Sequence, residues 1–198
     1  MEEIILKEEF EELMKVKGEA RGLGFQTEAK FILEKKGEEG LKKLEDEMER
    51  LGHPYSDIKT MDFYPLGLLG VALLTIKKLF NFTDQDFQEL GAFEAKSSLI
   101  IRVSMKYFIS LDRMAKEVPK MWRQYYSVGD FKIIEMNKGR KDVLIRLENF
   151  KLHPILCQVF IGYFTSLMRM ITRSDQITCE EIKCAHRGDE FHEFFIKW

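Results

Sequence analysis

The sequence lacks an excess of charge of either sign. Its 31 lysines and arginines nearly balance its 33 aspartates and glutamates, which leaves a formal net charge of −2. Nucleic-acid-binding domains usually carry a basic patch or stripe, and this composition offers no basic excess to form one. No apolar run approaches the ~18 residues of a membrane-spanning helix, and the charged N-terminus does not resemble a signal peptide. We therefore expect no nucleic-acid partner and no membrane span.

Cysteine is scarce, and the glycines do not form a nucleotide-binding motif. Three cysteines are too few for a disulfide framework and fit a reducing, cytoplasmic setting. Gly22 and Gly24 form only a G-x-G pair, without the third glycine and the preceding strand of a dinucleotide-binding loop. The sequence shows no flavin or nicotinamide fingerprint and no recognisable Ser/His/Asp set. It therefore gives little support for an enzyme.

Charged helices are predicted for the N-terminal segment, residues 1–52. Apolar residues make up 45% of the 198, enough for one domain with a substantial core. Helices are expected over residues 2–17, 27–36 and 38–51. Gly18 and Gly37 end the first two, because glycine is favoured just after a helix C-terminus, and Thr27 can cap the start of the second.

The middle of the chain is also predicted to be helical. Residues 66–80 are apolar nearly all round, so this helix should be buried on more than one side. Thr83 followed by Asp86 is an N-terminal capping signature for a helix that runs to about residue 95. Residues 104–126 form the longest predicted helix, which Pro119 should kink or divide.

The helix over residues 104–126 is rich in aromatic side chains and methionine. One interpretation is ordinary core packing. The other is the wall of an apolar ligand cavity, because such pockets are lined by aromatic and flexible side chains. The candidate ligand-binding residues on this interpretation are Tyr107, Phe108, Leu111 and Trp122, together with Tyr163 from the next helix.

Two hairpins and one helix are expected in the last third. Strands over residues 129–136 and 141–150 flank a turn at 137–140, and strands over residues 177–186 and 190–198 flank a turn centred on Gly188. Between them, a helix should start at His153-Pro154, because proline is tolerated in a first helical turn. The sequence therefore predicts an α+β fold, in which a helical N-terminal part packs on a four-stranded antiparallel sheet made of two hairpins with one crossing helix.

The last 46 residues contain a possible zinc site. Cys157 lies on the apolar stripe of its helix, and a turn centred on Gly188 places Cys184 opposite His192, with Cβ atoms ~5 Å apart. One zinc ion can span that gap. Glu181 would lie on the other strand face from Cys184 unless a bulge turns it inward; otherwise the ligand set is incomplete. The alternative is a pair of buried thiols and a satisfied histidine.

These residues also carry a resemblance to a known family. The pattern consists of Cys157, Gly162-Tyr163, Glu181, Cys184, Gly188 and His192. It resembles the C-terminal half of the vinyl-4-reductase domain, a small-molecule-binding module related in fold to haem nitric-oxide-binding domains and to transport-protein-particle subunits of Golgi trafficking. The close match covers about a quarter of the chain.

The resemblance implies that residues 53–198 are a ligand-binding domain. It also implies that Cys157, Glu181, Cys184 and His192 hold a structural zinc ion, as in the aromatic-sensing members of the family. His192 stands where the family has cysteine. Histidine is a competent zinc ligand, but the substitution could equally mark a site that has lost its metal.

Three functions follow from these observations. The first is a sensory or regulatory domain that binds a small hydrophobic molecule and acts through a separate output protein. The second is a dimerising interaction module like the trafficking subunits, which fits an expected homodimer. The third is a reductase accessory protein. Haem is not expected, because the haem-binding relatives use an axial histidine on a helix, and no long helix before His153 contains one.

Overall fold

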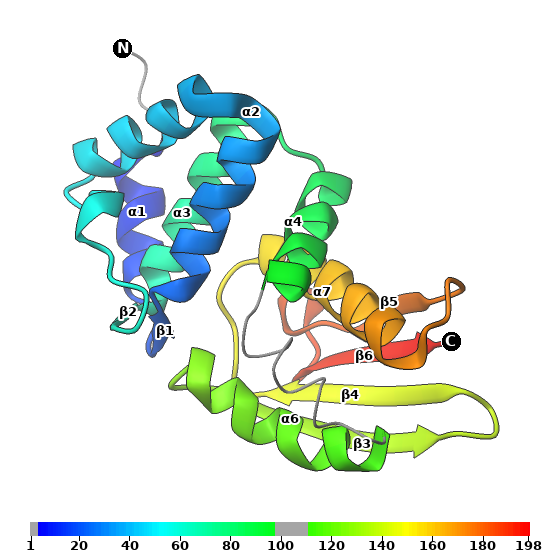
Figure 1. Ribbon diagram of the computed structural model, residues 1–198. Helices are drawn as coiled ribbons and strands as arrows, with labels where there is room; N and C mark the ends of the chain where they lie inside the picture. Colours follow the sequence, from blue (N-terminus) through cyan, green and yellow to red (C-terminus); the bar gives the residue numbers. More distant parts are fainter. Residues whose placement is uncertain (1–3, 98–110) are drawn as a thin grey trace.

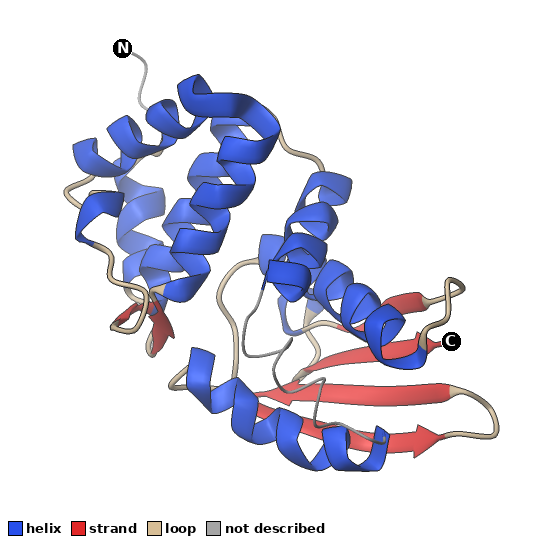
Figure 2. Ribbon diagram, in the orientation of Figure 1, coloured by secondary structure: helices blue, strands red, loops and turns tan. Residues whose placement is uncertain are grey.

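The fold places a group of helices beside a second half that contains an antiparallel sheet. A computed structural model of the protein describes residues 4–97 and 111–198 (Figure 1). Helices α1 (Lys7–Met14), α2 (Leu23–Arg50) and α3 (Leu66–Phe80) pack together at the N-terminal end. Figure 2 shows that the larger sheet lies wholly within the other half. The expected α+β class is confirmed.

The larger sheet joins the two expected hairpins. Its four strands run in the antiparallel order β3-β4-β6-β5. They are β3 (Asp130–Asn137), β4 (Asp142–Glu148), β5 (Thr178–Lys183) and β6 (His192–Lys197). A separate two-stranded sheet pairs β1 (Glu19–Arg21) with β2 (Phe63–Pro65).

Helix α7 (Pro154–Thr172) crosses one face of the larger sheet and packs on β5 and β6. The predicted start at His153-Pro154 is confirmed: Pro154 opens the helix, and Nδ1 of His153 accepts a hydrogen bond from the Ile155 N–H at 3.2 Å. By length and composition alone α7 could cross a membrane. Its contacts with the sheet and with α4 (Asp84–Ser97) instead make it a core helix.

Glycine and proline act differently within the other helices. At Gly37 the backbone of α2 adopts φ 70°, so this long helix is two helices joined at a kink, as the sequence predicted. Proline was expected to kink or divide the next aromatic helix. In the described part of the chain, α6 (Leu111–Tyr125) continues through Pro119 without a division.

Helices α4 and α7 approach each other closely through two glycines. A Cβ atom added at Gly162 would lie 1.9 Å from the carbonyl oxygen of Gln88, and one added at Gly91 would lie 1.9 Å from that of Val159. Both carbonyl oxygens belong to helical backbone, so they cannot move aside to relieve the steric clash. The two backbones are therefore in direct contact, and this contact fixes where α7 crosses the sheet.

We predict that Gly162→Ala destabilises the protein strongly, because the added methyl group forces the two helices apart. Overpacking of this kind costs about 1–3 kcal/mol, or roughly 3–10 °C in Tm for a chain of this size. Gly139→Ala is the control, since its added Cβ would meet only a side-chain atom of Asn137 at 3.4 Å. Thermal unfolding followed by circular dichroism measures both; equal Tm values would contradict the glycine contact.

Candidate functional site

Four potential metal ligands meet between α7 and the last two strands. Cys157 comes from α7, Glu181 from β5, Cys184 from the end of β5 and His192 from the start of β6. One ligand atom from each lies within 4.8 Å of all the others. All four residues are at most 9% exposed. The structure thus brings together the complete set that the sequence singled out.

A β-bulge turns Glu181 into this cluster. The register between β5 and β6 shifts after Glu181, which pairs with Phe194, whereas Lys183 pairs with Glu193. As a result Glu181 is 9% exposed, and the following Ile182 is 46% exposed. The bulge that the sequence required for an inward-facing Glu181 is therefore present.

The connection between β5 and β6 differs from the prediction. A three-residue turn centred on Gly188 was expected, but the short 3-10 helix η2 (Ala185–Arg187) follows β5 and lengthens the loop. The Cys184 N–H donates a hydrogen bond to Oδ2 of Asp189 at 2.7 Å and so holds the loop closed. This side-chain contact, which could not be read from the spacing of residues, lets a longer loop still bring Cys184 near His192.

The distances in the cluster suit a tetrahedral ion. Two Zn–S bonds of about 2.3 Å at a tetrahedral angle place the sulfurs about 3.8 Å apart. The sulfurs of Cys157 and Cys184 are 3.8 Å apart, and Cys157 Sγ is 3.7 Å from Nδ1 of His192. Oε1 of Glu181 is 2.8 Å from the same nitrogen and would move slightly outward around an ion. The donor set therefore fits zinc.

The other nitrogen of His192 is held by the backbone. Nε2 lies 3.2 Å from the carbonyl oxygen of Phe150. Since a carbonyl only accepts, Nε2 carries a proton. Nδ1 faces the cluster and shares a hydrogen bond with Oε1 of Glu181; a bound ion would take the place of the proton in that hydrogen bond. Metal-binding histidines usually donate their second N–H in this way, which fixes the tautomer.

The electrostatics of the cluster favour the binding of a cation. Burial and the neighbouring Glu181 carboxylate raise the pKa of the Cys157 thiol well above its usual range. Burial also raises the pKa of Glu181, but hydrogen bonds with His192 and the two thiols outweigh it and leave that pKa below its ordinary value. A divalent ion would supply the positive charge that stabilises thiolates here.

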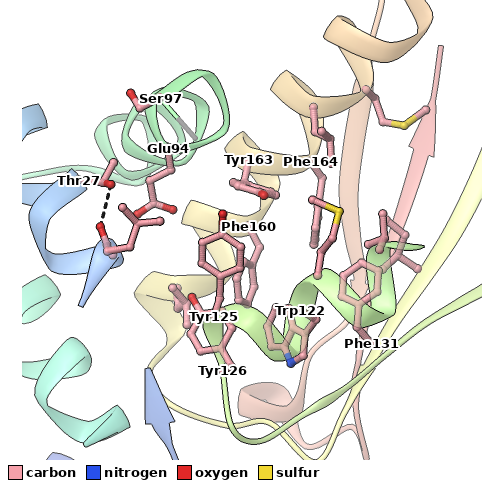
Figure 3. A pocket seen from close by; sticks show the side chains of 18 of the residues that line it. Thr27, Glu94, Ser97, Trp122, Tyr125, Tyr126, Phe131, Phe160, Tyr163 and Phe164 are labelled. Carbon is pink, nitrogen blue, oxygen red and sulfur yellow. Dashed lines mark hydrogen bonds between the residues drawn. The ribbon is translucent and has the colours of Figure 1, made fainter. Parts of the chain in front are cut away.

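A cavity of about 140 Å³ lies between the helices and the sheet (Figure 3). The described residues that line it come mainly from α2, α4, α6, α7 and the sheet, while α3 contributes Leu69. The predicted residues Trp122 and Tyr163 are among them. Tyr107 and Phe108 lie outside the described residues, as does the side chain of Leu111. Helices α2 and α4 thus form most of the wall that does not come from α6, α7 and the sheet.

Two carboxyl groups face this largely apolar cavity, and neither was among the predicted site residues. Glu28 on α2 is 1% exposed, and its Oε2 accepts a hydrogen bond from the Tyr55 hydroxyl at 3.1 Å. Glu94 projects from α4 toward the aromatic side chains of α6 and α7 (Figure 3). The helical spacing of Glu28 from the buried Phe31 and Ile32 was the available signal.

Burial changes the protonation of these groups. It raises the pKa of Glu94 to about 8. Burial, followed by repulsion from Glu94, raises the pKa of Glu28 well above its ordinary value. Burial therefore favours the protonated form of both carboxyl groups, and Glu94 tends to hold its proton at neutral pH when the cavity contains no cation.

Comparisons with known proteins identify the fold. No protein-family model matches the chain, and no curated protein matches it. Among solved structures, an H-NOX protein from S. oneidensis in the Fe(II)NO ligation state has a TM-score of 0.67 at 12% identity, covering 89% of this chain and 98% of that one. The H-NOX domain from Shewanella oneidensis in the Fe(II)CO ligation state gives 0.66 at 13% identity, covering 89% and 97%. The chain therefore has the H-NOX fold.

These neighbours contradict the expectation about haem. A further match, from work on haem distortion in the H-NOX family, has a TM-score of 0.62 at 12% identity and covers 90% of this chain and 94% of that one. The expectation that haem plays no part was therefore wrong for this fold. The described cavity lining contains no histidine, so a histidine-ligated haem does not fit these walls. Its side chains able to ligate haem iron are tyrosines and methionines, namely Tyr125, Tyr126, Tyr163, Met121 and Met168.

The half-buried Glu94 in the cavity wall should make stability depend on pH. Its pKa is higher in the folded state than the ordinary 4.5, so its contribution is fully present below about pH 4.5 and is lost as the pH rises toward 8. We predict that the free energy of unfolding falls between pH 5 and pH 8 in the wild type, and that this fall is about 1–3 kcal/mol smaller in Glu94→Gln. Urea unfolding at both pH values measures this. The exposed Glu38→Gln is the control, and parallel curves for all three proteins would refute the prediction.

Proposed function

We propose that this chain is a sensory or regulatory domain that binds a small, largely apolar molecule in the cavity between α2, α4, α6, α7 and the sheet. The cavity itself carries this proposal. Its volume of about 140 Å³ is close to that of an engineered cavity that binds benzene. The walls combine aromatic rings with a few polar groups, which is the usual composition of a ligand site. The shared fold with H-NOX proteins supports the same conclusion.

Cys157, Glu181, Cys184 and His192 hold a structural zinc ion in this proposal. Four protein ligands close the coordination sphere and leave no position for substrate or water. The ion would join α7 to β5 and β6, and it would compensate the charge of the buried thiolates. The vinyl-4-reductase resemblance supports this assignment, because its pattern has the same four positions with cysteine in place of His192. The expected homodimer and separate output protein stay predictions.

Metal content tests the zinc site directly. We expect about one zinc ion per chain in protein purified without a His-tag, measured by elemental mass spectrometry. Cys184→Ser should lose the ion and lower the Tm by about 10 °C or more, because metal-binding energy is folding energy. Cys179→Ser is the matched control, since Cys179 lies on β5 outside the cluster and is free. A metal-free wild type, or zinc retained in Cys184→Ser, would rule out the proposed site.

Two neighbouring residues on β3 allow a test of the cavity. Ile133 lines the cavity, whereas Ile134 is 42% exposed. We predict that toluene binds the wild type with a Kd of roughly 0.1–1 mM, given the binding energy available to so small a ligand. Ile133→Phe should fill the cavity and weaken binding at least tenfold, while Ile134→Phe should bind as the wild type does. Fluorescence of Trp122 in the cavity wall follows the titration. Equal binding by both variants would place the ligand elsewhere.

A further inference from the structure

The charged side chains among the described lining residues of the cavity are all acidic. Among its described lining residues are two glutamates, Glu28 and Glu94, and no lysine, arginine or histidine. The glutamates come from two neighbouring helices, α2 and α4, and repulsion from Glu94 helps to raise the pKa of Glu28. No cation of the described residues contributes to the pKa of Glu94. The cavity therefore carries paired acids without a described counter-charge.

Glu28 is held at the cavity by its burial and by one hydrogen bond. Its side chain is 1% exposed, and among the hydrogen bonds of the described residues it accepts one, from Tyr55 to Oε2. Glu28 lines the cavity together with Glu94. Burying a carboxylate costs free energy, and a cationic ligand in this cavity would offset that cost.

The remaining walls fit a particular kind of cation. Trp122, Tyr126 and Tyr163 line the same cavity as the two glutamates, and aromatic rings attract cations through the negative charge of their faces. Calcium and magnesium require six or more oxygen ligands, which the apolar walls do not offer. An organic ammonium ion suits both parts of the cavity, because its carbon atoms contact the rings and its charge faces the carboxylate.

We propose that the ligand of this cavity is a small organic ammonium ion, an amine or a quaternary ammonium compound of about benzene size, held by Glu94 and Glu28. This inference rests on the proposed ligand-binding function and adds the chemical class of the ligand. When the cation enters, Glu94 gives up its proton and pairs with it. Glu28 keeps its proton, which leaves the filled cavity neutral overall.

This arrangement makes binding depend on pH in a defined direction. Among the described residues, the titratable groups that face Glu94 are Glu28 from α2, Tyr125 from the end of α6, Tyr126 just after it, and Tyr163 from α7. Burial raises the pKa values of Tyr126 and Tyr163 well above their usual range, so these phenols stay neutral. Glu94 alone must lose a proton, which occurs more readily as the pH approaches about 8. The affinity for a permanent cation should therefore rise with pH and then level off.

Choline and 3,3-dimethylbutan-1-ol test the proposal, because they have the same shape and differ in charge. Calorimetric titrations are carried out on the full chain at pH 6, 7 and 9. We expect choline to bind at least tenfold more tightly than the alcohol at pH 9, and its affinity to fall about tenfold between pH 7 and pH 6. The affinity for the alcohol should not change with pH.

Glu94→Gln identifies the carboxylate responsible. It should weaken choline binding at least tenfold at pH 9 and abolish the pH dependence, while binding of the alcohol stays unchanged. Glu38→Gln, on the exposed side of α2, should behave as the wild type. If both compounds bind equally, the cavity is a ligand site but the cation proposal is overturned. If neither compound nor toluene binds, the proposed function itself fails.

Discussion

The direct backbone contact between α4 and α7 positions everything else in the second half of the molecule. Gly91 and Gly162 leave no side chain between the two helices, so α7 has little freedom to slide or rotate against α4. One face of α7 then presents Cys157 to the strands, and further along the helix Tyr163 reaches the cavity beside Glu94. Two sites of different chemistry thus depend on one close contact between helices.

The two sites differ in how their buried ionisable side chains are arranged. The cluster around Cys157 concentrates donors of several kinds, and the Phe150 carbonyl orients His192 from behind. The cavity instead separates its two acids on different helices and surrounds them with aromatic rings. The first arrangement suits a compact ion with short, directional bonds. The second suits a larger, softer ligand whose charge is spread over a hydrocarbon surface.

The sequence revealed the cluster better than the cavity, for a physical reason. The helical and strand periods determine which face of an element a residue occupies. A cysteine on the apolar face of a helix, or an acid close to a possible bulge, can therefore be recognised in the sequence. The kink at Gly37 could therefore be predicted, whereas the inward turn of Glu181 was one of two alternatives that the sequence left open. Glu28 and Glu94 sit on helices with many exposed acids, and only tertiary packing distinguishes them. The loop of η2 escaped prediction because the Asp189 side chain closes it.

Phe150 belongs to both sites at once. Its carbonyl accepts the hydrogen bond of His192, and its ring packs edge-on against Trp122 at 5.2 Å and Tyr126 at 5.3 Å, and tilted against Phe160 at 6.0 Å. A single residue between β4 and α7 therefore touches the ligand cluster with its backbone and the cavity wall with its side chain. Phe150 therefore separates the two sites and contacts both, so a movement of its backbone at His192 would also move its ring against Trp122 and Tyr126.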